Sequence, residues 1–295
     1  MRLLIAGWQG QVAHALVEIA PGQPDVTACA VGRPALDICE VRSIERALGD
    51  TRPDIVINTA AYTAVDKAEA ESERAFALNC EGARLLATAA AKRGVPIIHL
   101  STDYVFDGTK ASPYLESDAV APTTVYGRSK LEGEEAVKAA NPRHVILRTA
   151  WVYSPFGRNF VKTVLAQARE TGNLRVVTDQ RGSPTYAPHL VEAILAVARR
   201  ATDTKSGEAS WGVYNAAGAG TATWHEMAQQ VLREARDLNG AEVPIEPIGT
   251  ADYPTNSRRP ANSQLDCGKL EREFGIRLPH WKEGVAACVA RLEGR

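Results

Sequence analysis

The sequence has no long apolar run and no paired-cysteine motif. No apolar stretch approaches the roughly 20 residues that a membrane-spanning helix needs. The apolar run that follows Met1 and Arg2 ends at Gly7, which is too short for a secretory signal. The five cysteines form no CxxC pair, so we expect reduced thiols and neither a disulfide framework nor a zinc site. These absences predict a soluble, cytoplasmic protein that does not enter a membrane.

The sequence also lacks an excess of charge of either sign. The formal net charge is −1 and the isoelectric point about 6.6, without a long block of like charge. A nucleic-acid groove or a polybasic membrane face therefore has no electrostatic support, and a small-molecule ligand is the better expectation. The six histidines share no metal-ligand spacing, so we expect no metal. No G-x-S-x-G or P-loop motif is present, which removes hydrolase and NTPase interpretations.

The first half of the chain alternates short β-branched runs with longer segments of helical period. The strand candidates are apolar throughout, which is typical of strands buried on both faces. They are residues 2–7, 25–31, 54–60, 96–103 and 144–153, with helical segments between them at 11–20, 41–49 and 71–94. This alternation predicts a Rossmann-like, doubly wound α/β fold with a parallel sheet.

The rhythm changes after residue 153, where turn-rich and proline-rich segments become frequent. We expect a discontinuous nucleotide-binding domain that consists of residues 1–152 and 187–218. A smaller C-terminal domain for the substrate would consist of residues 153–186 and 219–295. A ligand would then lie in the cleft between the two domains.

A glycine-rich loop, "GWQGQVA", follows the first predicted strand and leads into a helix. Glycine at positions 7 and 10 lets the backbone turn tightly and approach a pyrophosphate, which the N-terminus of the next helix would hold. The other loop residues expected at the cofactor are Gln9, Gln11 and Val12. The alternative is an ordinary glycine turn, but the position after strand one favours a dinucleotide site.

The second predicted strand ends with Arg33 instead of the acidic residue that pairs with an adenosine 2′-OH. A guanidinium suits a 2′-phosphate, so NADPH is favoured and NADH is the alternative. Arg33 could equally be a solvated surface residue. Asp37 in "LDI" is either an acceptor at the adenine edge or part of a helix N-cap region.

Candidate catalytic residues follow the fourth strand and open the next helix. Thr102 and Asp103 lie at the carboxyl end of a central strand, where open α/β sheets bind ligands. Tyr126 and Lys130 share one helical face four positions apart. A ketone that is reduced needs a proton on oxygen, and a lysine beside a tyrosine would lower the tyrosine pKa for that task. In this hypothesis Thr102 orients the substrate oxygen; each residue alone also has an ordinary structural interpretation.

Taken together, "GWQGQVA", "HLSTDYVFDG", "YGRSKLEGE", "RTAWVY", "DQRGSPT" and "RRPANSQLD" resemble the dTDP-4-dehydrorhamnose reductase family of extended short-chain dehydrogenases/reductases. The resemblance implies reduction of the 4-keto group of dTDP-4-dehydro-β-L-rhamnose by NAD(P)H. It also implies a catalytic triad of Thr102, Tyr126 and Lys130, with Trp151 stacking on or contacting the sugar. Cofactor contacts would come from Gly10, Gln11, Val12, Asp37, Ile38, Ala60, Ala61, Tyr62 and Thr63.

Two further expectations concern the dimer interface and the substrate diphosphate. Some members hold magnesium at a dimer interface through glutamates, but the corresponding positions here are Ala15 and the region of Pro188, so we expect a monomer or weak homodimer. Arg258 and Arg259 lie where the second domain would close the cleft, and we assign one of them to the substrate diphosphate. A solvated surface pair is the alternative.

Two other functions compete with reduction. A nucleotide-sugar epimerase or dehydratase of the same superfamily would keep its cofactor bound and return the hydride to the substrate. A non-catalytic, NADP-binding regulatory subunit is the second rival, and the intact Thr102, Tyr126 and Lys130 argue against it.

Overall fold

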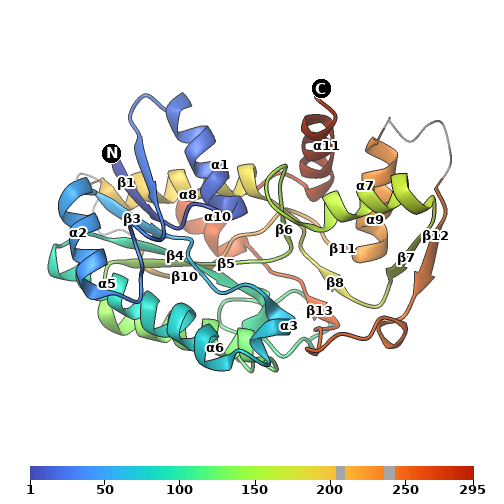
Figure 1. Cartoon of the computed structure of the whole chain (residues 1–295), viewed down its shortest axis with the longest axis horizontal. Helices are drawn as coiled ribbons and strands as arrows, with labels where there is room; N and C mark the ends of the chain where they lie inside the picture. Colours follow the sequence, from blue (N-terminus) through green and yellow to red (C-terminus); the bar gives the residue numbers. More distant parts are fainter. Residues whose placement is uncertain (204–209, 236–242) are drawn as a thin grey trace.

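A six-stranded, fully parallel sheet forms the centre of the molecule (Figure 1). The computed structural model describes residues 1–203, 210–235 and 243–295. The strand order is β10-β5-β4-β3-β1-β2. The strands are β1 (Arg2–Ala6), β2 (Thr27–Val31), β3 (Ile55–Asn58), β4 (Ile97–Thr102), β5 (His144–Thr149) and β10 (Gly212–Asn215). The predicted doubly wound α/β fold is confirmed, and each predicted strand of the first half is present.

Helices cover both faces of this sheet (Figure 1). One face packs against α1 (Gln11–Ile19), α8 (Ala187–Thr202) and α10 (Gly268–Phe274). The other face packs against α2 (Val41–Thr51), α5 (Ala83–Lys92) and α6 (Val125–Ala140). Central strands such as β3 are buried on both faces, which explains why their sequences are apolar throughout.

From β1 the chain adds β2 on one side, whereas β3, β4 and β5 follow on the other side, so the order of strands changes direction between β1 and β3. The connection after β1 passes over one face through α1, and the connection after β3 passes over the other face. A crevice therefore opens at the carboxyl ends of these two strands, where doubly wound sheets bind their ligands. The glycine-rich loop and residues 59–63 lie at this point.

The predicted helix over residues 71–94 is not regular. After α3 (Val65–Ala68) and α4 (Ser72–Phe76), a π-helical turn at Ala77–Gly82 precedes α5. Asn79 in that turn accepts a hydrogen bond from the Tyr62 backbone N–H at 2.7 Å and donates to the Tyr62 carbonyl at 3.0 Å. A π-bulge often marks a functional position, because the extra residue redirects a side chain. Here the turn points Asn79 at the loop that follows β3.

Residues after β5 build three small sheets at the other end of the molecule (Figure 1). They pair β6 (Val152–Tyr153) with β9 (Thr185–Tyr186), β7 (Leu174–Val177) with β12 (Ile245–Ile248), and β8 (Arg181–Gly182) with β11 (Ala222–Thr223) and β13 (Asn262–Ser263). Three helices, α7 (Phe160–Thr171), α9 (Trp224–Glu234) and α11 (Trp281–Leu292), share a hydrophobic core with them. Short 3₁₀ turns occur at Ala20–Gly22, Asp103–Val105 and Thr250–Asp252. The division into two domains remains a prediction. The predicted range 187–218 includes residues 204–209, and the predicted range 219–295 includes residues 236–242; both short segments lie outside the described residues.

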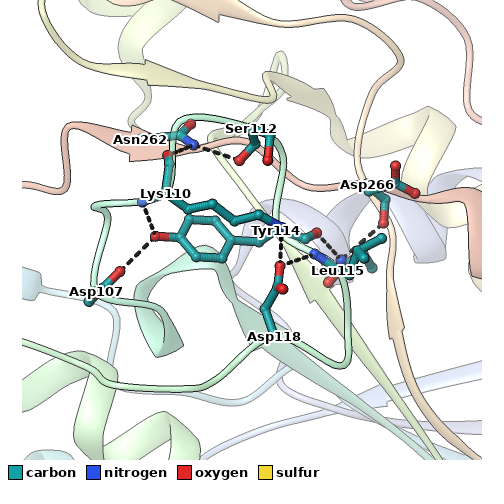
Figure 2. A network of polar contacts seen from close by, with 9 residues as sticks. Asp107, Lys110, Ser112, Tyr114, Leu115, Asp118, Asn262 and Asp266 are labelled. Carbon is teal, nitrogen blue, oxygen red and sulfur yellow. Dashed lines mark hydrogen bonds and ion pairs between the residues drawn. The ribbon is translucent and has the colours of Figure 1, made fainter.

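A polar network holds the loop after β4 against β13 (Figure 2). The Asn262 amide donates to the carbonyls of Lys110 and Ser112 at 2.6 and 3.0 Å. The Tyr114 hydroxyl donates to Asp107 at 2.7 Å and accepts from the Lys110 N–H at 3.0 Å. These bonds fix the position of Ser263, the next residue of β13.

No helix among the described residues combines the length and apolar character needed to cross a bilayer.

Candidate active site

The loop after β1 leaves room for a ligand backbone to approach closely. Gly7 has a φ of +104°, which side-chain-bearing residues rarely adopt. A Cβ added at Gly7 would lie 2.6 Å from Thr59 Oγ1, in the segment that follows β3. Gly10 is the N-cap of α1, and a Cβ added there would meet no atom within 4 Å. The N-terminus of α1 therefore opens into the crevice between β1 and β3, as a pyrophosphate site requires.

The other loop residues differ in what they offer. Gln9 is exposed, whereas the Val12 side chain is buried in the core. The Gln11 amide is used within the protein: it donates to the Val152 carbonyl at 3.1 Å and accepts from Ser154 Oγ at 2.7 Å. Gln11 thus ties the glycine-rich loop to the chain after β5, and its backbone N–H remains at the helix N-terminus.

A pocket of about 380 Å³ lies beside this crevice. Five residues predicted at the cofactor line it, namely Arg33, Asp37, Ala61, Tyr62 and Thr63. Lys67 and Arg74, which the sequence did not single out, add two cationic groups to the same wall. Ile38 instead packs against Gly82 of the π-helical turn, where an added Cβ would lie 2.8 Å from Ile38 Cγ1.

Asp37 takes part in the turn before α2, whose N-cap is Glu40, and also lines a pocket, so its contact with an adenine edge stays a prediction. Its Oδ1 accepts a hydrogen bond from the Cys39 N–H at 2.9 Å, which shapes the turn before α2. The same residue lines the 380 Å³ pocket. Ala60 donates its backbone N–H to Asn58 Oδ1 at 3.1 Å, so its conformation is set by the end of β3.

Thr102, Asp103 and Tyr126 meet at the carboxyl end of β4. Thr102 Oγ1 donates to Asp103 Oδ1 at 3.2 Å, and the Thr102 side chain also contacts the Tyr126 phenol. The Tyr126 backbone is fixed by the start of α6, where the Thr124 side chain caps the helix by accepting from the Gly127 N–H at 3.0 Å. Strand β4 and helix α6 thus bring together residues 24 positions apart in the chain.

Burial governs the acid–base properties of these groups. It raises the pKa of Tyr126 above its ordinary value, and the hydrogen bond with Thr102 opposes only part of this effect. It also raises the pKa of Asp103 to about 7, against hydrogen bonds from Ser263 and Thr102 that favour the carboxylate. The expected lowering of the Tyr126 pKa is therefore wrong for this structure, because desolvation of the phenolate outweighs the favourable contacts.

Lys130 lies one turn beyond Tyr126 and is fully enclosed. Its Nζ donates to the Leu100 carbonyl at 2.7 Å and lies 3.3 Å from His99 Nε2. Burial lowers the pKa of Lys130 to about 8, although the Glu134 carboxylate favours the ammonium form. The contacts of Lys130 Nζ with Leu100 and His99 hold this nitrogen at β4.

A second pocket, of about 370 Å³, extends from Tyr104, the residue after Asp103, toward the small sheets. Trp151 and Arg259 line it together with Tyr104 and Ser263. Arg259 donates to the Tyr104 hydroxyl at 3.1 Å, whereas the neighbouring Arg258 is exposed and outside the lining. Of the two arginines that the sequence could not distinguish, only Arg259 faces the pocket.

Trp151 has both faces of its indole covered. Its ring stacks on Trp224 with centroids 3.5 Å apart and planes 4° from parallel. A Cβ added at Gly182 would lie 2.4, 2.6 and 2.7 Å from Cε2, Nε1 and Cζ2, a pattern that places Gly182 over the ring instead of at its edge. Trp151 Nε1 donates to Ser263 Oγ at 3.1 Å. In this conformation Trp151 presents its edge to the pocket, so stacking on a sugar would require rearrangement while edge contact would not.

Comparison with known proteins identifies the family of this chain. The RmlD substrate binding domain family matches residues 1–293. A dTDP-4-dehydrorhamnose reductase from Sinorhizobium fredii is 48% identical over 297 residues, which cover 100% of this chain and 99% of the relative. The chain belongs to the dTDP-4-dehydrorhamnose reductase family.

Solved structures of this family have the same architecture. A dTDP-4-dehydrorhamnose reductase from Clostridium acetobutylicum superposes with a TM-score of 0.91 at 35% identity, covering 99% of this chain and 100% of that one. Another from Bacillus anthracis, in complex with NADP, gives 0.89 at 32% identity, covering 98% and 99%. A UDP-glucose 4-epimerase from Thermus thermophilus gives 0.82 at 18% identity, which shows a shared fold alone. The family resemblance predicted from the sequence motifs is confirmed.

In this member of the dTDP-4-dehydrorhamnose reductase family, several residues at the site were not predicted. Tyr104, Ser263 and Trp224 line the second pocket, and Gln180 accepts the Trp224 Nε1–H at 3.1 Å. Tyr104 and Ser263 lie inside motifs already quoted, so their position beside Asp103 and Arg259 was a usable signal. Trp224 had no such signal, because it is the first residue of α9 and the hydrophobic periodicity of that helix accounts for an apolar residue there equally well.

Proposed function

We propose that this protein reduces the 4-keto group of dTDP-4-dehydro-β-L-rhamnose to give dTDP-β-L-rhamnose, with NADPH as the reductant. Its full-length similarity to dTDP-4-dehydrorhamnose reductases supports the substrate and the reaction. The observation that carries the proposal is the contact between Thr102 and Tyr126 at the carboxyl end of β4, next to Tyr104 of the 370 Å³ pocket. A hydroxyl pair there can bind and protonate a carbonyl oxygen.

The residues of the first crevice fit a dinucleotide. Gly7 provides a cradle that a Cβ would fill, and the N-terminus of α1 provides backbone N–H donors for a pyrophosphate. Arg33 and Lys67 on the wall of the 380 Å³ pocket would hold a 2′-phosphate, which favours NADPH over NADH. When bound, NADPH supplies the hydride.

The chain's own residues would orient the substrate and supply the proton. Tyr126 remains a neutral phenol at physiological pH because burial raises its pKa, so it can donate a proton to the substrate oxygen. Thr102 would orient that oxygen by a hydrogen bond, and Lys130 would hold a cofactor ribose. Arg259 would bind the diphosphate, since a guanidinium matches its charge and geometry.

Incubation of the purified protein with dTDP-4-dehydrorhamnose and each nicotinamide cofactor tests this function. We expect stoichiometric consumption of NADPH and formation of dTDP-rhamnose, and a slower reaction with NADH. An epimerase or dehydratase would change the sugar without net NADPH consumption, because it returns the hydride. A regulatory subunit would bind NADPH without turnover.

We also propose that the protein acts in the cytoplasm as a monomer or weak homodimer. Its five cysteines are free, in keeping with a reducing compartment. Ala15 and Pro188 are buried and carry no carboxylate that could bind an interfacial metal. Sedimentation with and without magnesium would test this: a magnesium-dependent dimer would contradict it.

A further inference from the structure

His99, on β4, makes one polar contact through each of its ring nitrogens. Its Nδ1 lies 3.0 Å from Asn58 Nδ2, and its Nε2 lies 3.3 Å from Lys130 Nζ. All three side chains are at most 2% exposed. In such an enclosed site every donor must face an acceptor, because water cannot satisfy it.

The orientation of the Asn58 amide is determined by its other contact. The Ala60 backbone N–H donates to Asn58 Oδ1 at 3.1 Å, so the oxygen must point toward Ala60. The Asn58 NH₂ group therefore faces His99 Nδ1 as a donor. Consequently Nδ1 accepts and carries no hydrogen.

The tautomer of His99 follows from this contact. Burial lowers the pKa of His99 well below its ordinary value, so the ring is neutral and carries a single N–H. With Nδ1 accepting, that hydrogen is on Nε2 and points at Lys130 Nζ. A neutral amine can accept it, whereas an ammonium has no lone pair to do so.

Two arrangements of these hydrogens are then available. With Lys130 as a neutral amine, His99 Nε2–H donates to Nζ, and Nζ donates to the Leu100 carbonyl. With Lys130 as an ammonium, Nε2 must accept and the hydrogen moves to Nδ1, where it faces the Asn58 NH₂. Relief of that conflict requires the Asn58 amide to turn, which breaks its bond with the Ala60 N–H.

We propose that His99 is a positioning residue which, held in its Nε2–H tautomer by Asn58, favours the neutral amine of Lys130 and couples the charge of this lysine to the backbone at Ala60. The inference extends the proposed function, since Ala60 lies at the cofactor crevice and Lys130 lies beside Tyr126. A change in the charge of Lys130 would thus be felt at the Ala60 backbone through His99 and Asn58.

One charged group near Lys130 opposes the neutral amine. Glu134, one turn further along α6, favours the ammonium form. Its carboxylate is largely neutralised by Arg148, whose Nε and Nη2 donate to it at 2.9 and 2.7 Å, and it also accepts from Ser101 Oγ at 2.6 Å. Burial outweighs Glu134 and lowers the pKa of Lys130 to about 8, below its ordinary value.

Nuclear magnetic resonance of ¹⁵N-histidine-labelled protein tests the proposal without substrate. The His99 ring, identified by its loss in His99→Gln, should show an acceptor Nδ1 and a protonated Nε2 above the Lys130 pKa of about 8. Below that pKa the hydrogen should shift toward Nδ1. In Lys130→Met the ring should stay in the Nε2–H form throughout the same range, because no charge change occurs nearby.

Asn58→Asp should invert the tautomer, because a carboxylate accepts both from the Ala60 N–H and from His99 Nδ1–H. The matched control is Asn141→Asp, a buried asparagine that donates to the Val95 carbonyl away from this site. It should leave the His99 signals unchanged. An Nδ1–H tautomer in the wild-type protein above the Lys130 pKa, or a pH-independent tautomer, would overturn the proposal. Such a result in a protein that reduces the keto sugar would reject this inference alone and leave the proposed function standing.

Discussion

Asp66 on α3 and Arg259 in the segment before β13 form an ion pair, with Oδ2 and Nη2 2.5 Å apart. Asp66 Oδ1 also accepts from the backbone N–H and the hydroxyl of Ser257, at 3.1 and 2.7 Å. On the same short stretch, Glu69 Oε1 accepts the Val125 N–H at the start of α6 at 2.9 Å. The segment around α3 therefore contacts both the wall of the 370 Å³ pocket and the helix that carries Tyr126.

The first prediction separates the two arginines. Arg259→Ala should raise the KM for the sugar nucleotide by about one to two orders of magnitude, since a hydrogen bond to a charged group contributes roughly 1.5–3 kcal/mol. Arg258→Ala is the matched control and should change KM little, because Arg258 is exposed outside the pocket. Steady-state kinetics at saturating NADPH measure both. Equal effects of the two substitutions would contradict the assignment.

The second prediction concerns the paired tryptophans. Trp151→Ala should weaken substrate binding, because it removes a large aromatic surface from the 370 Å³ pocket. Trp224→Phe keeps an aromatic ring against Trp151 and should have a much smaller effect. Titration of each variant with dTDP-sugar provides the affinities. Unchanged affinity and turnover in Trp151→Ala would exclude a substrate role for this residue.

The third prediction concerns the proton donor. Tyr126→Phe keeps the ring volume and removes the hydroxyl, so turnover should fall by about 10²–10⁴-fold, the range typical of general acid–base catalysis. The fold and NADPH affinity should be retained, which circular dichroism and cofactor titration would show. Retention of most of the activity would mean that Tyr126 and Lys130 are two ordinary residues on one helical face, and that the proton comes from another donor.

The fourth prediction addresses cofactor choice. Arg33 lines the wall of the 380 Å³ pocket, where we propose that it meets a 2′-phosphate. Arg33→Ala should weaken NADPH binding by about 1.5–3 kcal/mol and NADH binding much less. Dissociation constants for both cofactors, measured by fluorescence titration, decide the matter. Equal losses for NADPH and NADH would reject a 2′-phosphate contact.

The fifth prediction follows from the buried Asp103 carboxyl. Its folded-state pKa of about 7 exceeds the ordinary 3.8, so between these values the folded state binds more protons than the unfolded state. Stability from this group is therefore present at low pH and is lost as the pH rises toward 7. Asp103→Asn removes this dependence, so its Tm relative to wild type should be more favourable above pH 7 than near pH 4. The same difference in Tm at both pH values would show that Asp103 is ionised with an ordinary pKa.

Much of the fold could be read from local sequence. Apolar runs such as residues 54–60 are buried on both faces of a parallel sheet, and this burial is itself the cause of their composition. The glycine loop and the spacing of Tyr126 and Lys130 are likewise local features, because helix geometry alone places residues four apart on one face. The π-helical turn at Ala77–Gly82 was not predicted, since it arises from contacts of Asn79 with Tyr62 and not from hydrophobic period.

The sequence by itself determined the α/β fold, the family and the set of residues that meet at the end of β4. Only the tertiary structure distinguished Arg259 from Arg258, covered the faces of Trp151 with Trp224 and Gly182, and brought His99 to Lys130. It also reversed the expected direction of the Tyr126 pKa shift. The physical reason is that periodicity and turn chemistry are properties of neighbouring residues, whereas burial and hydrogen-bond direction depend on which distant segments pack around a side chain.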